Sequence, residues 1–131
     1  MDFLLNLLIL RLERIMKLEN NKYSIQGVSL EQLALDYGSP LYIYDGEKIK
    51  TQYHKLKNAF SGVDVHIKYA CKALSNINIL KLLKNEGAEL DCVSIEEVQL
   101  GLYAGFTPTQ ILFTPNCVSF DEIKQAVALG V

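Results

Sequence analysis

The stretch His66–Ala73, with the sequence HIKYACKA, is the part of the chain from which the fold can be worked out. Apolar side chains alternate with polar or small ones along it, which is typical of a strand with one buried face. The capping pair Ser75-Asn76 follows, and apolar residues then recur at helical spacing from Ile79. Lys72 is therefore predicted to lie at the C-terminal end of a strand, just before a turn into a helix. Ligands bind at this edge in parallel α/β folds, so the Lys72 amine is a candidate nucleophile for a carbonyl cofactor.

Lys72 also has a simpler interpretation as a solvated surface charge. Lysine is almost never fully buried, and most lysines at strand ends face water. The choice between the two interpretations depends on the rest of the chain.

Composition narrows the class of protein. The 131 residues are 50% hydrophobic and carry a net charge of −2, which suits a chain with one modest core. The slightly acidic balance gives no reason to expect nucleic acid as a partner. Cys71, Cys92 and Cys117 are widely spaced and lack the paired spacing of zinc or redox motifs. We therefore expect free thiols, a reducing cytoplasm and no metal site.

Residues 1–15 form a dense apolar run that differs from the rest of the chain. Asn6 and Arg11 interrupt it, and it is too short for a membrane span, which needs about 20 apolar residues. A signal peptide would begin with basic residues, whereas Asp2 precedes this run. We interpret the segment as an upstream extension, with Met16 as the natural start. The alternative is an amphipathic helix that docks on a partner, and peptides from this segment in the natively expressed protein would favour it.

The segment that follows Met16 is expected to hold short elements. A weak strand or turn is predicted at 23–28, and a helix then begins at Ser29, with Gln32 placed to complete a capping box. Residues 41–45 are aromatic and β-branched and predict a strand. A helix over 49–60 is expected next.

From Val63 onward the chain predicts the same unit three times, a strand and then a helix that ends at a glycine. Consecutive units of this kind favour parallel strands with right-handed crossovers. A closed (β/α)8 barrel needs about 250 residues, so we expect the chain to be the N-terminal part of a larger protein. The predicted strands are 63–71, 88–93 and 111–114, and the predicted helices are 75–86, 95–104 and 119–129.

Polar side chains gather at the ends of these predicted strands. Lys72 ends the first, Asp91 and Ser94 the second, and Thr114 and Asn116 the third. Lys72 and Asp91 could both face the inside of a curved sheet and form a pair. A nucleophilic amine must first lose its proton, and a carboxylate beside Lys72 would alter how readily the lysine does so. A purely structural Lys–Asp pair accounts for the spacing equally well.

Several stretches resemble one family. Tyr69–Leu74 (YACKAL) is similar to the pyridoxal-phosphate attachment signature of the group IV decarboxylases, which include the diaminopimelate, ornithine and arginine enzymes. Gly38–Asp45 resembles the segment that opens diaminopimelate decarboxylases. Leu90–Ser94 and Ile111–Asn116 resemble their second and third units. The resemblance covers roughly residues 23–131.

The resemblance implies an architecture. The fold class would be α/β, namely the N-terminal part of an alanine-racemase-like (β/α)8 TIM barrel of fold type III. Residues 1–15 would be the extension. Residues 16–46 would be a segment with a strand that belongs to the family's β-domain, and residues 47–131 would be the first part of the barrel.

The resemblance also implies roles for residues. Lys72 would attach pyridoxal 5′-phosphate covalently, Ala70 would leave room beside the cofactor, and Asp91 would be an active-site carboxylate. Many family members carry a lysine at the position of Val118, so the chain departs from the family pattern there. The histidines, His54 and His66, match no family site and are expected to be structural or solvated. Further cofactor-binding positions would be Ser94, Glu97 and Asn116.

The implied activity is decarboxylation of meso-diaminopimelate to L-lysine by a cytoplasmic homodimer. The phosphate cradle, the ring-stacking histidine, the partner of the pyridine nitrogen and an acid cysteine from a second subunit would all lie beyond Val131. Residues 1–131 alone are therefore expected to be inactive. The alternatives are an ornithine, arginine or carboxynorspermidine decarboxylase, a non-catalytic pyridoxal-phosphate carrier on the same barrel, and an α/β fragment without a cofactor.

Overall fold

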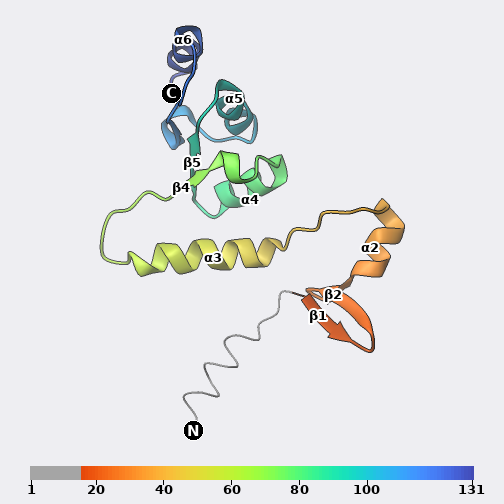
Figure 1. The fold of residues 1–131 in the computed structure, drawn as a ribbon. Coiled ribbons are helices and arrows are strands. Elements are labelled where there is room, and N and C mark those ends of the chain that lie inside the picture. The colour runs from red at the N-terminus through yellow and green to blue at the C-terminus, as the bar shows by residue number, and fades with distance from the viewer. Residues whose placement is uncertain (1–15) are drawn as a thin grey trace. The chain divides into compact units, whose positions relative to one another are not determined.

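The computed structural model describes residues 16–131, which form two units with a boundary between Lys48 and Ile49. The interpretation of residues 1–15 as an upstream extension lies outside the described residues. Within the described part, no helix combines the length and the apolar character needed to cross a membrane. Figure 1 shows the order of the elements along the chain.

The first unit holds a small antiparallel sheet. Strand β1 (Met16–Glu19) pairs with β2 (Lys22–Ile25), which in turn pairs with β3 (Val28–Ser29). Asn20 and Asn21 connect β1 to β2 with φ angles of 50° and 62°, the left-handed conformation that a two-residue hairpin needs and asparagine tolerates. β1 was not predicted from the sequence, although this Asn-Asn pair was the available signal.

Helix α2 (Leu30–Tyr37) follows directly, and its predicted cap is confirmed in part. The Ser29 hydroxyl accepts a hydrogen bond from the Gln32 backbone N–H at 3.4 Å. The other half of the expected capping box is absent, because the Gln32 side chain donates to Asp36 instead, at 2.7 Å. Residues 41–45, for which a strand is predicted, pair with no described strand.

The second unit contains the three predicted strand–helix units. Its strands form a parallel sheet in the order β4-β5-β6, which confirms the predicted parallel arrangement. Helix α3, which begins before the unit boundary, precedes the sheet. The bounds are α3 (Gly46–Ala59), β4 (Lys68–Ala70), α4 (Ile77–Asn85), β5 (Glu89–Cys92), α5 (Ile95–Tyr103), β6 (Ile111–Phe113) and α6 (Phe120–Ala128).

The first strand of this sheet is shorter than the predicted span 63–71. Among residues 16–131, β4 pairs only with β5, and it begins at Lys68 because β5 offers a ladder partner from Glu89 onward. The Glu89 N–H donates to the carbonyl of Ile67 at 3.0 Å, and this bond marks the start of the pairing. The residues before Ile67 have no strand beside them in the described chain.

Helix boundaries follow the predicted signals closely. Asn76 caps α4 by accepting from the Asn78 N–H at 2.9 Å, and Ser119 caps α6 through a full capping box with Glu122. A glycine at positive φ follows α4, α5 and α6, as expected for residues that leave a helix through the left-handed region. These glycines are Gly87, Gly105 and Gly130.

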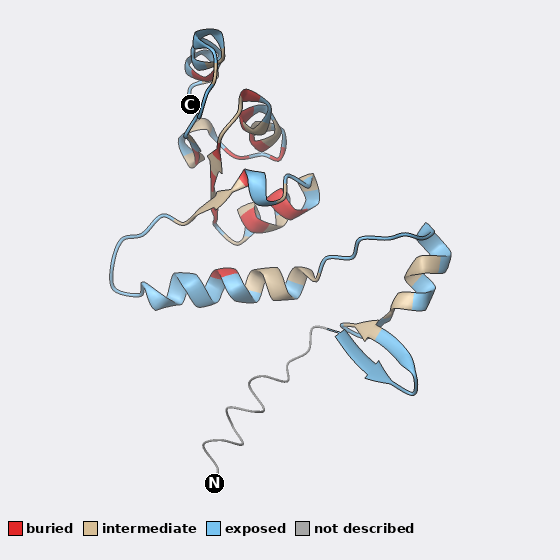
Figure 2. Ribbon diagram, in the orientation of Figure 1, coloured by how far each residue is buried: buried red, intermediate tan, exposed pale blue. Residues whose placement is uncertain are grey.

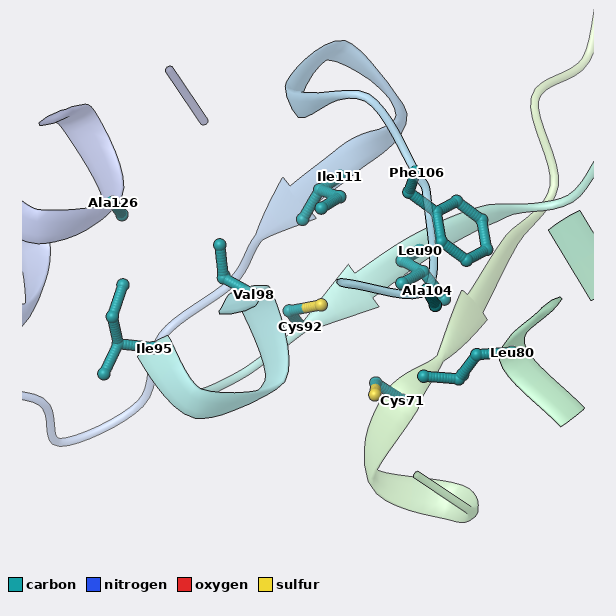
Figure 3. Close-up of a cluster of buried hydrophobic side chains, with 10 residues drawn as sticks. All are labelled: Cys71, Leu80, Leu90, Cys92, Ile95, Val98, Ala104, Phe106, Ile111 and Ala126. Atoms are coloured by element: carbon teal, nitrogen blue, oxygen red, sulfur yellow. The ribbon is translucent and has the colours of Figure 1, made fainter. Parts of the chain in front are cut away.

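One face of the parallel sheet carries the core. Leu90 and Cys92 on β5 are fully buried, as are Leu80 on α4 and Val98 on α5. Figure 3 shows these side chains converging with Cys71, Ile111 and others. In Figure 2 the buried positions concentrate on α4, α5 and β5.

The opposite face of the same sheet is more open and mostly polar. Lys68, Ala70, Glu89 and Asp91 are intermediate in exposure, and Leu112 is exposed. On β5 the two acidic residues alternate with buried Leu90 and Cys92. Helices therefore cover one side of an unclosed parallel sheet, which is the arrangement of a partial (β/α)8 barrel.

Candidate active site

Lys72 lies directly after β4 in the 3-10 turn η1 (Cys71–Ala73). The predicted position at the end of a strand is therefore shifted, because the chain turns at Cys71 and the Leu74 N–H closes the turn on the Cys71 carbonyl at 3.2 Å. The lysine side chain is exposed. Within the described part of the chain, its amine has neither an ion-pair partner nor a hydrogen bond, so it is available to react.

Asp91 lies beside the lysine-bearing segment. It is paired in register with Ala70, whose small side chain leaves the space next to β5 open. The hydroxyl of Thr114 donates a hydrogen bond to Asp91 Oδ1. Thr114 follows β6, and its own N–H donates to the Cys92 carbonyl at 2.8 Å, which extends the strand pairing to this residue.

The expected Lys72–Asp91 pair is not formed, which corrects the sequence-based hypothesis. Lys72 lies in the η1 turn, where its amine has no ion-pair partner among the described residues, while Asp91 on β5 accepts a hydrogen bond from Thr114. Among residues 16–131, the lysine ion-paired on this face of the sheet is Lys68, and its partner is Glu89.

Glu89 is the centre of a charged group that sequence reasoning did not single out. Lys68 Nζ donates to Glu89 Oε2, and His66 Nδ1 lies 2.6 Å from Glu89 Oε1. These two hydrogen bonds, that of Lys68 first, hold the pKa of Glu89 below its ordinary value. The in-register pairing of Lys68 with Glu89 brings the group together, and that pairing could not be read from the sequence.

The two histidines hold positions that fit the structural or solvated interpretation. His66 is exposed and contacts Glu89. His54 Nε2, on α3, lies 2.7 Å from Glu86 Oε2.

Ser94 and Glu97 form the start of α5. The Ser94 hydroxyl accepts from the Glu97 N–H at 3.3 Å, and the Glu97 carboxylate accepts from the Val93 N–H at 2.8 Å. Both side chains are therefore engaged in capping the helix. Asn116 lies in the loop after β6, where it is exposed and its Oδ1 accepts from the Cys117 thiol.

Two buried cysteines and a half-buried glutamate form a group of possible metal donors, which includes Cys71, the neighbour of Lys72. Cys71, Cys92 and Glu97 place their sulfur and oxygen atoms within 4.8 Å of one another, although the spacing of the cysteines along the chain predicted no such group. Burial raises the pKa of the Cys71 thiol and raises that of Cys92 to about 12. Both thiols are therefore neutral near pH 7, and a metal ion would bind them only by displacing their protons. All three cysteines are free thiols, as expected.

The chemistry that this edge of the sheet can perform follows from Lys72 and Asp91. An exposed primary amine can attack a carbonyl carbon, and a nearby carboxylate can balance the positive charge that the amine carries when protonated. The Cys71 and Cys92 thiols are buried and neutral, so they are poor nucleophiles by comparison.

Comparisons with known proteins agree with this chemistry. Residues 46–131 match the family described as pyridoxal-dependent decarboxylase, pyridoxal binding domain. A diaminopimelate decarboxylase of Methanothermobacter thermautotrophicus is 41% identical over 109 residues, which are 82% of this chain and 26% of that protein. A diaminopimelate decarboxylase of Helicobacter pylori is 46% identical over 101 residues, 77% of this chain and 25% of that protein.

A solved structure shows the same likeness in three dimensions. The crystal structure of diaminopimelate decarboxylase from Helicobacter pylori complexed with L-lysine superposes with a TM-score of 0.73 at 42% identity. The match covers 77% of this chain and 26% of that one. The chain thus spans about a quarter of the length of the curated relatives it matches.

Proposed function

Because this chain belongs to the pyridoxal-dependent decarboxylases, through their pyridoxal-binding domain, we propose that the whole protein decarboxylates meso-diaminopimelate to L-lysine. The observation that carries the proposal is the Lys72 amine, which is exposed on η1 at the carboxyl edge of a parallel sheet and has no partner in the described chain. The two curated relatives reported above are both diaminopimelate decarboxylases, which supports this choice of substrate.

The residues at this edge fit a pyridoxal cofactor. Lys72 would hold it by a covalent bond from its Nζ to the cofactor's carbonyl carbon, and Ala70 presents only a methyl group beside it. When bound, pyridoxal phosphate supplies a ring that accepts the electron pair left behind as carbon dioxide departs.

Asp91 would act on the charge of the amine. Its carboxylate would stabilise the positive charge that this nitrogen carries once it is bonded to the cofactor, and would thereby favour attachment. Ser94 and Glu97 would support the cofactor site less directly, because both already serve the start of α5. Asn116 would contribute from the loop after β6.

The proposal is tested first by attachment of the cofactor. The protein, expressed over its full reading frame, is expected to bind pyridoxal phosphate with an absorbance band at about 420 nm. Borohydride reduction followed by peptide mapping should place the label on Lys72. The Lys72→Ala variant should lose the band and the label, whereas Lys55→Ala, at an exposed position on α3, should retain both. A band that survives Lys72→Ala would overturn the assignment.

Substrate choice needs a separate measurement. Carbon dioxide release should be fastest with meso-diaminopimelate and much slower with ornithine, arginine and carboxynorspermidine. Faster release from one of these amino acids would assign the protein to another branch of the family. Attachment of the cofactor at Lys72 with no release from any of them would favour a non-catalytic carrier.

The remaining proposals concern assembly. We propose that the whole protein is a cytoplasmic homodimer, with the three free thiols as support for a reducing compartment. Light scattering on the purified protein would test the dimer.

We also propose that residues 16–46 form a separate segment, in which residues 41–45 add a strand to a β-domain. Residues 41–45 pair with no described strand and are mostly exposed, with Tyr42 at 87%.

A further inference from the structure

The carboxylate of Asp91 is held from the neighbouring strand end. Thr114 Oγ1 donates to Asp91 Oδ1, and among residues 16–131 no hydrogen bond reaches the second carboxylate oxygen. Ala70, the register partner of Asp91 on the other side, offers no polar side-chain atom. The orientation of this carboxylate in the described chain therefore depends on one hydroxyl.

Thr114 is well placed to hold a partner in position. Its N–H donates to the Cys92 carbonyl at 2.8 Å, so its backbone continues the β5–β6 pairing past Phe113. Threonine is β-branched and stiff about χ1, whereas the terminal torsion of aspartate is broad and easily turned. A rigid donor on a fixed backbone thus restrains a side chain that would otherwise rotate.

We propose that Thr114 is a positioning residue of the active site: it binds one oxygen of Asp91 and leaves the other oxygen free to face the Lys72 amine or the group attached to it. This inference rests on the proposed function, because it assumes that Asp91 acts on that amine. In this role Thr114 acts through Asp91 and not directly on the amine.

The test follows covalent attachment of pyridoxal phosphate to the apoprotein, expressed over its full reading frame, by the rise of absorbance at about 420 nm. Thr114→Val keeps the shape of the side chain and removes its donor. Loss of a hydrogen bond to a charged group is expected to slow attachment about tenfold. Thr114→Ser retains a hydroxyl and should stay within about twofold of the wild type. Thr51→Val, at an exposed position on α3, is the matched control and should be unchanged.

A double-mutant cycle with Asp91→Asn separates positioning from a general structural role. If Thr114 acts through Asp91, then Thr114→Val should add no further slowing in the Asp91→Asn background. Slowing by the same factor in both backgrounds would overturn the inference, and so would a Thr114→Val rate equal to that of the wild type. These outcomes leave the proposed function intact. A wild-type protein that attaches no cofactor at Lys72 would overturn the proposed function, and the inference with it.

Discussion

At the residue scale, the three cysteines are set apart by burial. Cys71 and Cys92 have no exposed surface, and burial raises the pKa of Cys92 to about 12, whereas Cys117 is exposed in the loop after β6. Thiolate is the reactive form, so the two buried thiols are both inaccessible and protonated. The position of Cys71 next to Lys72 in the sequence therefore does not make its thiol part of the lysine's chemistry.

We predict that a thiol reagent modifies Cys117 within minutes in the native protein, while Cys71 and Cys92 react only after unfolding. Mass spectrometry of tryptic peptides at successive times would measure this. Cys117→Ser should remove the fast phase. Fast labelling of Cys92 in that variant would contradict the buried placement of the thiol.

Glu89 links the stability of the protein to pH. Because Lys68 and His66 hold its native pKa below the ordinary 4.5, the carboxylate stabilises the fold fully above that value. The contribution is lost as the pH falls below 4.5 and through the lower native pKa. Glu89→Gln is thus expected to lower the free energy of unfolding at pH 7 and to flatten its fall in this acid range.

Urea unfolding at a series of pH values would measure the effect of Glu89→Gln. The control is Glu19→Gln, which alters an exposed glutamate on β1 and should leave the pH profile unchanged. Equal acid sensitivity of the wild type and Glu89→Gln would show that Glu89 is not the group responsible.

At the scale of elements, α5 approaches the sheet through a glycine. A Cβ added at Gly101 would lie 2.7 Å from Leu90 Cδ1 and 3.2 Å from Ile111 Cδ1. Both side chains belong to the core, where they have little room to move. The close contact between α5 and β5 therefore depends on the missing side chain.

Gly101→Ala is predicted to destabilise the protein. Alanine stabilises a helix by about 1 kcal/mol relative to glycine, but overpacking a core costs about 1–3 kcal/mol. The free energy of unfolding should therefore fall by about 1 kcal/mol. Thermal unfolding would measure it. Leu90→Val removes the δ carbons, so the double variant should be less destabilised than the sum of the two single changes. If the destabilisation of the double variant equalled the sum of the two single changes, the strain of Gly101→Ala would not come from its contact with Leu90.

Element boundaries were the part of the fold best predicted from sequence. The predicted caps Ser29 and Asn76 both cap helices in the structure, because an N-cap depends on a side chain and the two or three backbone groups that follow it. Strand lengths were predicted less well. β4 covers only Lys68–Ala70, because a strand extends no further than its neighbour pairs with it.

At the scale of the whole molecule, the chain presents its candidate site on an open surface. Lys72 and Thr114 are exposed, and Asp91 is only partly buried. The relatives that share this part are about four times as long. A site open to water holds a cofactor by few contacts and lowers barriers poorly, because water competes for each charge.

We therefore predict that residues 1–131 alone release no carbon dioxide from meso-diaminopimelate, even with added pyridoxal phosphate. The measurement is carbon dioxide release by purified residues 1–131, beside the protein expressed over its full reading frame as a positive control. Turnover by residues 1–131 above that of their Lys72→Ala variant would refute this prediction.

The sequence by itself determined the order of the helices, the parallel strand–helix repeat and the position of Lys72 near a strand end. Each of these depends on local patterns: apolar spacing, caps and terminal glycines. The attachment signature around Lys72 also pointed to the family that the comparisons then showed.

Only the tertiary structure decided which side chains meet. The register of β4 against β5 pairs Lys68 with Glu89, and the end of β6 brings Thr114 to Asp91, so the expected Lys72–Asp91 pair is replaced by two others. The same pairing buries Cys71 beside Cys92. Register is set by packing across the whole sheet, and a shift of one residue would send every side chain to the other face. No local stretch of sequence holds that information.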